Sequence, residues 1–326
     1  MQRRHFLASL AVLGSSGSPI VRAQARPARP ARIGIFHFGS AANFRAREDA
    51  FKREMRKLGY TEARVQFYSE GAYGQRDLLE RTAHTFAREP FDVILSASSL
   101  TTDALRRSAP DTPIVIGAAE DPVAEKFADS LQRPGRNITG IMASVLEHLR
   151  RHVEMLTQVS PRITRITALL NPDNATYAKY KGRLESAARA GLRIAVVDAR
   201  SDAELERAFP ARPREDAEGL LVMNDGYFYT QRRAIAELAS RARRPAIYPL
   251  RGFVEAGGLM SHGPNLEANF VRAAHIVDRI LKGERASDIP FEAPPRIELV
   301  LNRDTAEALK LAFPPELVKE ATTVLG

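Results

Sequence analysis

The sequence contains no cysteine and no tryptophan. Without cysteine the protein has no disulfide bond, no thiolate zinc site, no cysteine nucleophile and no lipid attached to an N-terminal cysteine. Without tryptophan, any aromatic contact with a ligand must come from Tyr, Phe or His. The chain also lacks an apolar run of about 18 or more residues, so the sequence predicts no membrane-spanning helix.

The sequence patterns of common enzymes are absent as well. There is no G-x-S-x-G, no G-x-x-x-x-G-K-[ST], no H-E-x-x-H and no G-x-G-x-x-G. His148 and His152 are four residues apart, but their neighbours are basic, and we expect a solvated surface there and not a metal site. We therefore predict a protein that is not an enzyme, with no catalytic residue, no bound metal and no cofactor.

The composition is that of a soluble globular protein with room for two domains. The chain has 326 residues, of which 44% are hydrophobic and 27% are charged. The net charge of +9 comes from arginines that are scattered along the chain, often beside acids, without a block of like charge. This pattern favours solvated faces, and we predict that the protein does not bind nucleic acid.

The N-terminus has the features of an export signal. Arg3 and Arg4 are followed by a short apolar run at residues 6–13, and residues 23–25 (AQA) form a small-x-small cleavage pattern. We predict that residues 1–25 are a signal peptide, cleaved near Ala25, and that the mature protein is periplasmic. The arginine pair resembles a twin-arginine signal, with general export as the alternative route.

The remainder of the chain alternates strands and helices in two similar series, which begin near residues 32 and 165. Strands that are almost wholly apolar indicate parallel sheets covered by helices on both faces. The sequence thus predicts the α/β class, with two Rossmann-like lobes. Extended segments between the series, at residues 137–142, 258–262 and 297–301, predict a hinge of three crossovers, and helix 266–281 returns to the first lobe. The predicted lobes are residues 26–141 with about 264–290, and 142–263 with about 291–326.

Polar residues follow several predicted strands of the first lobe. Ser40 follows the first strand, and Ser98 and Ser99 stand between the third strand and a helix. Hydroxyls and free backbone N–H groups at such a point can bind a carboxylate or phosphate, although serine is also an ordinary helix cap. After the fourth strand, Glu120 and Asp121 are placed to receive a cationic group, with helix capping by Asp121 as the alternative.

The second lobe repeats this arrangement. Asn171 follows its first strand, and Asn224 and Asp225 follow a strand of four apolar residues. Because ligands of open parallel sheets bind at the carboxyl ends of the strands, we predict that these side chains face a ligand. The predicted ligand-binding residues are Ser40, Ser98, Ser99, Glu120, Asn171, Asn224, Asp225 and Tyr248.

Several stretches together resemble one protein family. They are residues 121–123 (DPV), 135–140 (GRNITG), 245–265 (PAIYPLRGFVEAGGLMSHGPN) and 280–283 (ILKG). They resemble the substrate-binding proteins of ABC transporters of the tryptophan/tyrosine uptake type, and the resemblance covers the chain from about residue 32 to its end. It implies the type I periplasmic binding fold, a small-molecule ligand between the lobes, and an ABC permease in the inner membrane as partner.

The resemblance also implies roles for individual residues. Hydroxyls of the first lobe, here Ser98 and Ser99, bind the ligand carboxylate, and an acid of the second lobe, here Asp225, binds the amine. The sequence departs from the family at Glu120, where a small residue is common, and at His262, where tyrosine is common. We expect a monomer that captures an amino acid or a small organic acid.

Two other functions fit the same fold. An exported sensor would present its loaded state to a membrane protein instead of delivering the ligand. An exported hydrolase would need a nucleophile and a base in the cleft, and the sequence offers no recognisable pair of this kind.

Overall fold

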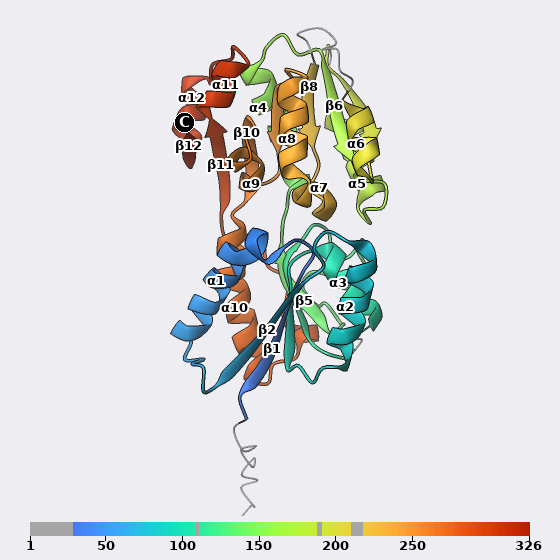
Figure 1. The fold of residues 1–326 in the computed structure, drawn as a ribbon, viewed down its shortest axis with the longest axis vertical. Coiled ribbons are helices and arrows are strands. Elements are labelled where there is room, and N and C mark those ends of the chain that lie inside the picture. The colour runs from blue at the N-terminus through green and yellow to red at the C-terminus, as the bar shows by residue number, and fades with distance from the viewer. Residues whose placement is uncertain (1–28, 109–110, 188–190, 210–217) are drawn as a thin grey trace, which may run out of the picture.

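The protein forms two α/β lobes joined by three connections, as the computed structural model in Figure 1 shows. The structure describes residues 29–108, 111–187, 191–209 and 218–326. The predicted signal peptide, residues 1–25, lies outside the described residues. Within them, no helix is both long and apolar enough to cross a membrane.

The first lobe is built on a parallel sheet of five strands in the order β2-β1-β3-β4-β5. Helices α1 and α10 cover one face of this sheet, and α2 and α3 cover the other. The strands are β1 (Ala31–His37), β2 (Val65–Gly71), β3 (Val93–Ser96), β4 (Ile114–Ala119) and β5 (Ile138–Met142). The helices are α1 (Ala41–Lys57), α2 (Arg76–Arg88), α3 (Ser99–Ser108) and α10 (Leu266–Leu281).

Burial on both faces explains why the strands read as continuous apolar runs. In β1, Ile33 and Ile35 pack under α1 and α10, and the neighbouring Phe36 packs on the opposite face against α2. Successive side chains of a strand point to opposite faces, so a sheet between two helix layers needs apolar residues at every position. The sequence prediction of a sheet covered on both sides is confirmed.

The second lobe has seven strands in the order β12-β11-β10-β9-β8-β6-β7. Its pairs are parallel except β10 with β11, which is antiparallel, so this sheet is mixed where the sequence predicted a parallel one. The antiparallel pair arises because the chain leaves the lobe after β10 and re-enters along the same edge as β11. The strands are β6 (Arg165–Leu170), β7 (Arg193–Asp198), β8 (Glu218–Val222), β9 (Ala246–Tyr248), β10 (Met260–Pro264), β11 (Ile297–Asn302) and β12 (Thr323–Leu325).

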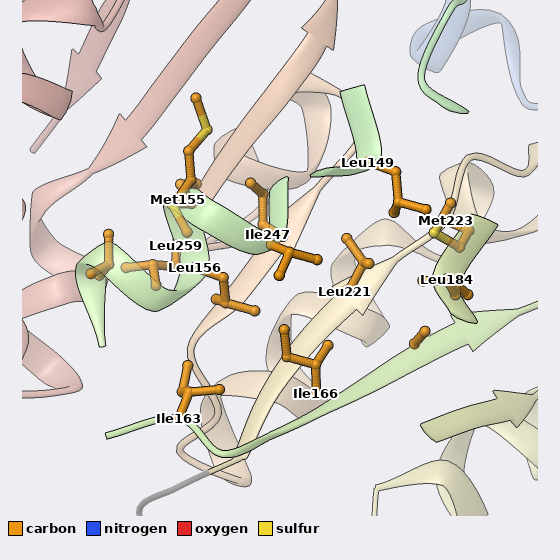
Figure 2. Packing of buried hydrophobic residues seen from close by; sticks show 14 of the residues in the cluster. Leu149, Met155, Leu156, Ile163, Ile166, Leu184, Leu221, Met223, Ile247 and Leu259 are labelled. Carbon is orange, nitrogen blue, oxygen red and sulfur yellow. The ribbon is translucent and has the colours of Figure 1, made fainter. Parts of the chain in front are cut away.

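Helices cover both faces of this second sheet as well. Figure 2 shows one of its two cores, in which Leu156 of α4 and Leu184 of α5 pack with Ile166, Leu221 and Ile247 of the central strands. The helices of the lobe are α4 (Leu149–Val159), α5 (Tyr177–Ala187), α6 (Asp202–Ala208), α7 (Gly226–Thr230), α8 (Arg232–Arg241), α9 (Arg251–Glu255), α11 (Arg303–Ala308) and α12 (Pro315–Glu320). Short 3-10 helices occupy Leu146–His148 and Ala286–Asp288.

The segments predicted as crossovers form strands, and the crossings lie beside them. Residues 137–142 form β5 at the edge of the first sheet, and the other two segments form β10 and β11 of the second. Backbone N–H and C=O groups of extended segments need partners, and the sheet edges supply them. The last crossing runs along β5, where Glu292 N–H donates to the Gly140 carbonyl at 2.9 Å and Met142 N–H donates to the Glu292 carbonyl at 2.8 Å.

The membership of each strand in one of the two sheets agrees with the division into lobes that the sequence predicts. β5 belongs to the first sheet, α10 packs against α1 and β4 of the first lobe, and β11 belongs to the second sheet. The boundaries at residues 141, 264 and 290 remain predictions, with which these memberships agree.

The prediction of a solvated surface around His148 and His152 is wrong for His152. Its ring is 1% exposed and is hydrogen-bonded to the His262 carbonyl at 2.8 Å, between α4 and β10 near the hinge. Burial lowers the pKa of His152 to about 3, so the ring is neutral at ordinary pH. The helical spacing of the apolar residues in α4 places His152 on the buried face beside Val153 and Leu156. The position of His152 on the helix therefore decides its burial, and its basic neighbours in the sequence do not.

Candidate ligand-binding cleft

A cavity of about 340 Å³ lies between the lobes, at the carboxyl ends of the strands of both sheets. This is the edge at which open parallel sheets bind their ligands. The structure brings all but one of the predicted site residues together here, from both sides of the cleft. Those that line the cavity are Ser40, Ser98, Ser99, Glu120, Asn171, Asn224 and Asp225.

Tyr248 is the exception. It is still part of strand β9, 1% exposed, and its ring stacks on Phe253 with centroids 4.9 Å apart, inside the core under α8 and α9. The alternation of the strand sends Ile247 to one face of the sheet and Tyr248 to the other, so its side chain packs against a helix and does not reach the strand end. The structure thus places this residue in the core and not in the cavity.

Two predicted residues of the cavity are also helix N-caps. The Ser40 hydroxyl accepts a hydrogen bond from the Asn43 N–H at 3.4 Å at the start of α1. Asp225 caps α7, and its Oδ1 accepts from the N–H groups of Tyr227 at 2.9 Å and Phe228 at 3.2 Å. Capping and ligand binding coexist here, because both use polar groups where a strand gives way to a helix.

Asp225 is held in place by two asparagines of the neighbouring strand end. Asn171 Nδ2 donates to Oδ1 at 3.1 Å, and Asn174 Nδ2 donates to Oδ2 at 2.9 Å. These contacts fix the direction of the carboxylate and contribute no positive charge. Asp225 therefore faces the cavity as an anion without an ionic partner among the described residues.

Glu120 stands between the hinge and the second lobe. Its side chain accepts from the Leu146 N–H at 2.7 Å and from Asn224 Nδ2 at 3.0 Å, and the residue is 8% exposed. Burial raises the pKa of Glu120 to about 7, although both hydrogen bonds favour the ionised form. The carboxyl therefore changes its charge near neutral pH.

Glu125 is a cavity residue that the sequence reasoning missed. It is 5% exposed, and its Oε2 atom is buried without a hydrogen-bond partner. Burial raises the pKa of Glu125 to about 7; the Ser99 hydroxyl opposes this shift and the charge of Glu120 adds to it. The residue lies in an irregular segment after β4, where no periodic pattern indicates which side chains turn inward.

The sequence reasoning also missed two arginines in another part of the cavity. Arg47 of α1 and Arg232 of α8 both stack over the ring of Tyr229, at 5.1 and 4.9 Å from its centroid. Neither forms an ion pair within the part of the chain that the structure describes. Burial and the charge of Arg232 lower the pKa of Arg47. Of the two adjacent aromatic residues, Phe228 is fully buried in the core and Tyr229 lines the cleft.

Polar contacts join the lobes across the cleft. Besides the bond between Asn224 and Glu120, Arg232 Nη2 donates to Asn43 Oδ1 at 2.8 Å. At the rim, Arg76 forms an ion pair with Asp173 at 3.0 Å, and Lys179 forms one with Asp121. Asp121 also accepts from the Ala124 N–H at 3.0 Å, so it caps a turn, where the alternative prediction was a helix cap. The structure therefore has a closed cleft.

The cavity offers groups for binding and no constellation for chemistry. Among the described residues no group of three or more His, Cys, Asp or Glu side chains could hold a metal ion. What the cleft presents is carboxylates near the hinge, hydroxyls and helix N-termini from both lobes, and two arginines over an aromatic ring. Such an arrangement is suited to a small molecule that carries charges of both signs.

Comparisons with known proteins agree with this architecture. A protein of known structure from Vibrio cholerae is 24% identical, covers 90% of this chain and 99% of its own, and has a TM-score of 0.81. A domain from Streptococcus pneumoniae, solved in complex with L-Trp, is 19% identical, covers 91% of this chain and 100% of its own, and also has a TM-score of 0.81. These likenesses show that the fold is shared.

The sequence comparisons reach further than the fold. The tyrosine-binding protein of Clostridioides difficile is 21% identical over 281 residues, which are 86% of this chain and 81% of that protein. The profile of the family described as ABC transporter substrate binding protein matches residues 32–325, almost the whole length after the predicted signal peptide. The chain belongs to the family of ABC transporter substrate-binding proteins, whose members bind a transported solute and are not enzymes.

Proposed function

We propose that this protein is exported to the periplasm, captures an amino acid in the cleft between its lobes, and delivers it as a monomer to an ABC permease in the inner membrane. The observation that carries the proposal is a closed cavity of about 340 Å³ with unpaired acids and unpaired arginines on its walls. A zwitterion balances the charge of both kinds of group at once, whereas a neutral sugar forms hydrogen bonds with them but brings no opposite charge.

The names of two relatives point to the same class of ligand. One is a tyrosine-binding protein, and another was solved with L-Trp in place. In our proposal Asp225 receives the α-amino group, with Asn171 and Asn224 beside it. Ser40, Ser98 and Ser99 offer hydroxyls at helix starts to the carboxylate, and Arg47 and Arg232 supply the positive charge that those hydroxyls lack.

A thermal-shift screen of the protein without residues 1–25 tests the proposal. The compounds are the common amino acids, small organic acids and neutral sugars as a control class. A ligand at 100 times its dissociation constant stabilises the folded state by about 2.7 kcal/mol, which is a clear rise in melting temperature. We expect at least one amino acid to give such a shift; a shift with sugars alone contradicts the proposal.

Export is tested separately in the native host. The basic start, the apolar run at residues 6–13 and the AQA pattern at 23–25 support cleavage near Ala25. Mass spectrometry of the periplasmic protein should give an N-terminus near Arg26. An intact N-terminus on the exported protein contradicts cleavage. In a separate experiment, replacing Arg3 and Arg4 by lysine should stop export if the twin-arginine route is used.

A further inference from the structure

The strongest unexplained feature of the cavity is the carboxyl group of Glu125. The residue is 5% exposed and lines the cavity, and Oε2 has no hydrogen-bond partner. A buried carboxylate oxygen without a partner costs free energy, so such groups are retained where something else satisfies them. Because Glu125 lines the cavity, a molecule bound there is the partner that this carboxyl would meet.

Glu125 does not stand alone. Glu120 lines the same cavity, and its negative charge adds to the rise in the pKa of Glu125. Neither forms an ion pair with a lysine or arginine in the described ranges, and the same holds for Asp225. The bonds to Glu120 come from an amide and a backbone N–H, which carry no net charge. Within the described residues, these carboxyls thus have no lysine or arginine paired with them.

We propose that the ligand carries a cationic nitrogen in its side chain, in addition to its α-amino group, and that Glu125 and Glu120 hold this nitrogen. The inference rests on the proposed function, because it assigns the side chain of the amino acid that the cleft binds. A guanidinium or ammonium group donates several hydrogen bonds and brings the missing positive charge. A neutral donor satisfies Oε2 but leaves two buried like charges beside each other.

The proposal makes binding sensitive to pH in a definite direction. In the ligand-free protein both carboxyls have a pKa of about 7, chiefly because of burial. A cation favours the ionised form, so binding lowers both pKa values and releases protons, and affinity falls as the pH drops below 7. The ionisable groups that face the pair are Asp121 with Lys179, Tyr180 and Asp225. The others that line the cavity are His37, Arg47, Arg76, Asp103, Arg106, Lys126, Asp173, Tyr227, Tyr229 and Arg232.

Calorimetry with two matched pairs of compounds tests the proposal. L-Arginine is compared with L-citrulline, which keeps the shape and N–H donors but not the charge, and L-lysine with L-norleucine. We expect a cationic compound to bind at least ten times more tightly than its neutral partner. If one carboxyl titrates, the affinity for the cationic compound should fall about tenfold from pH 8 to pH 6. Glu125→Gln should remove most of the preference for the cation and most of this pH dependence.

The control variant is Glu62→Gln, which changes an exposed acid outside the cavity and should bind as the wild type does. Circular dichroism shows whether Glu125→Gln is folded, and Glu125→Asp, which keeps the charge, should retain the preference for the cation in part. If L-tryptophan or L-tyrosine binds tightly while Glu125→Gln has no effect, the inference is overturned and the proposed function survives. If none of the amino acids binds, both are overturned.

Discussion

At the scale of single residues, Asp225 combines a structural and a binding task. It caps α7, receives both asparagine amides, and still presents a carboxylate to the cavity. Truncation to alanine removes the cap and leaves Asn171 and Asn174 without their acceptor, so a loss of binding would not reveal which task failed. Replacement by asparagine keeps an oxygen for the cap and removes the charge.

We therefore predict that Asp225→Asn weakens amino acid binding by at least about tenfold, the equivalent of 1.4 kcal/mol, because a charge-assisted hydrogen bond to the amine is lost. Stability should fall only modestly, since the cap remains while the Asn174 amide loses its acceptor at Oδ2. Calorimetry gives the affinity and thermal melting the stability. Ser201→Ala, which removes the N-cap of α6 outside the cavity, should cost about 1 kcal/mol of stability and leave binding unchanged. If the affinity of Asp225→Asn is unchanged, Asp225 acts only as a helix cap and does not bind the ligand.

At the scale of elements, strand β5 joins the first sheet to the hinge and depends on one glycine. Gly140 has a φ of +148°, and a Cβ atom there would lie 2.1 Å from the Ile116 carbonyl oxygen of β4. The pairing of β4 with β5 shifts its register between Ile116 and Ala119, next to this close approach. Only glycine allows β5 to lie this close to β4 at residue 140, where the backbone carbonyl also accepts the Glu292 N–H.

Gly140→Ala is accordingly expected to destabilise the protein by at least about 2 kcal/mol, from backbone strain and overpacking together. Urea unfolding followed by circular dichroism measures the effect. Gly182→Ala is the matched control, because Gly182 is exposed in α5 with no atom within 4 Å of its Cβ position. It should be neutral or stabilising by up to about 1 kcal/mol. Equal urea midpoints for Gly140→Ala and Gly182→Ala would contradict the close approach of residue 140 to the Ile116 carbonyl oxygen.

At the scale of the whole molecule, few contacts hold the cleft closed. The rim ion pairs, Arg76 with Asp173 and Lys179 with Asp121, are partly solvent-exposed, and surface pairs stabilise by about 0–1 kcal/mol each. The lobes are joined by three connections, and among the described residues the buried members of each hydrophobic cluster belong to one lobe. Leu266, at the start of α10, also packs against a cluster of the second lobe. Closure must therefore draw much of its free energy from the ligand.

X-ray scattering should thus show a smaller radius of gyration when a bound amino acid from the screen is added to the ligand-free protein. The reason is that the ligand satisfies charged groups of both lobes only in the closed form. A compound that gives no thermal shift is the control and should leave the radius unchanged. Saturation without a change in radius contradicts hinge closure, and a new product in NMR spectra of the mixture contradicts a pure binding protein.

The sequence by itself determined the class of fold and the polar residues at the strand ends of the cavity wall. Apolar strands alternating with amphipathic helices leave few options other than parallel sheets covered on both faces, and a polar residue after such a strand must lie at the sheet edge. Ser98, Asn171 and Asp225 were found in this way, because their positions follow from local pattern alone. The family resemblance agreed with this reasoning and supplied the expected roles.

Only the tertiary structure decided the chemistry of the cleft. Tyr248 belongs to the core and Glu125 to the cavity because of the face or turn each occupies, which neighbouring residues in the sequence do not reveal. Arg47 belongs to the first lobe and Arg232 to the second, and both stack on Tyr229 because the two lobes meet at the cleft. The raised pKa values of Glu120 and Glu125 have the same origin, since burial between two lobes is a property of their packing and not of the local sequence.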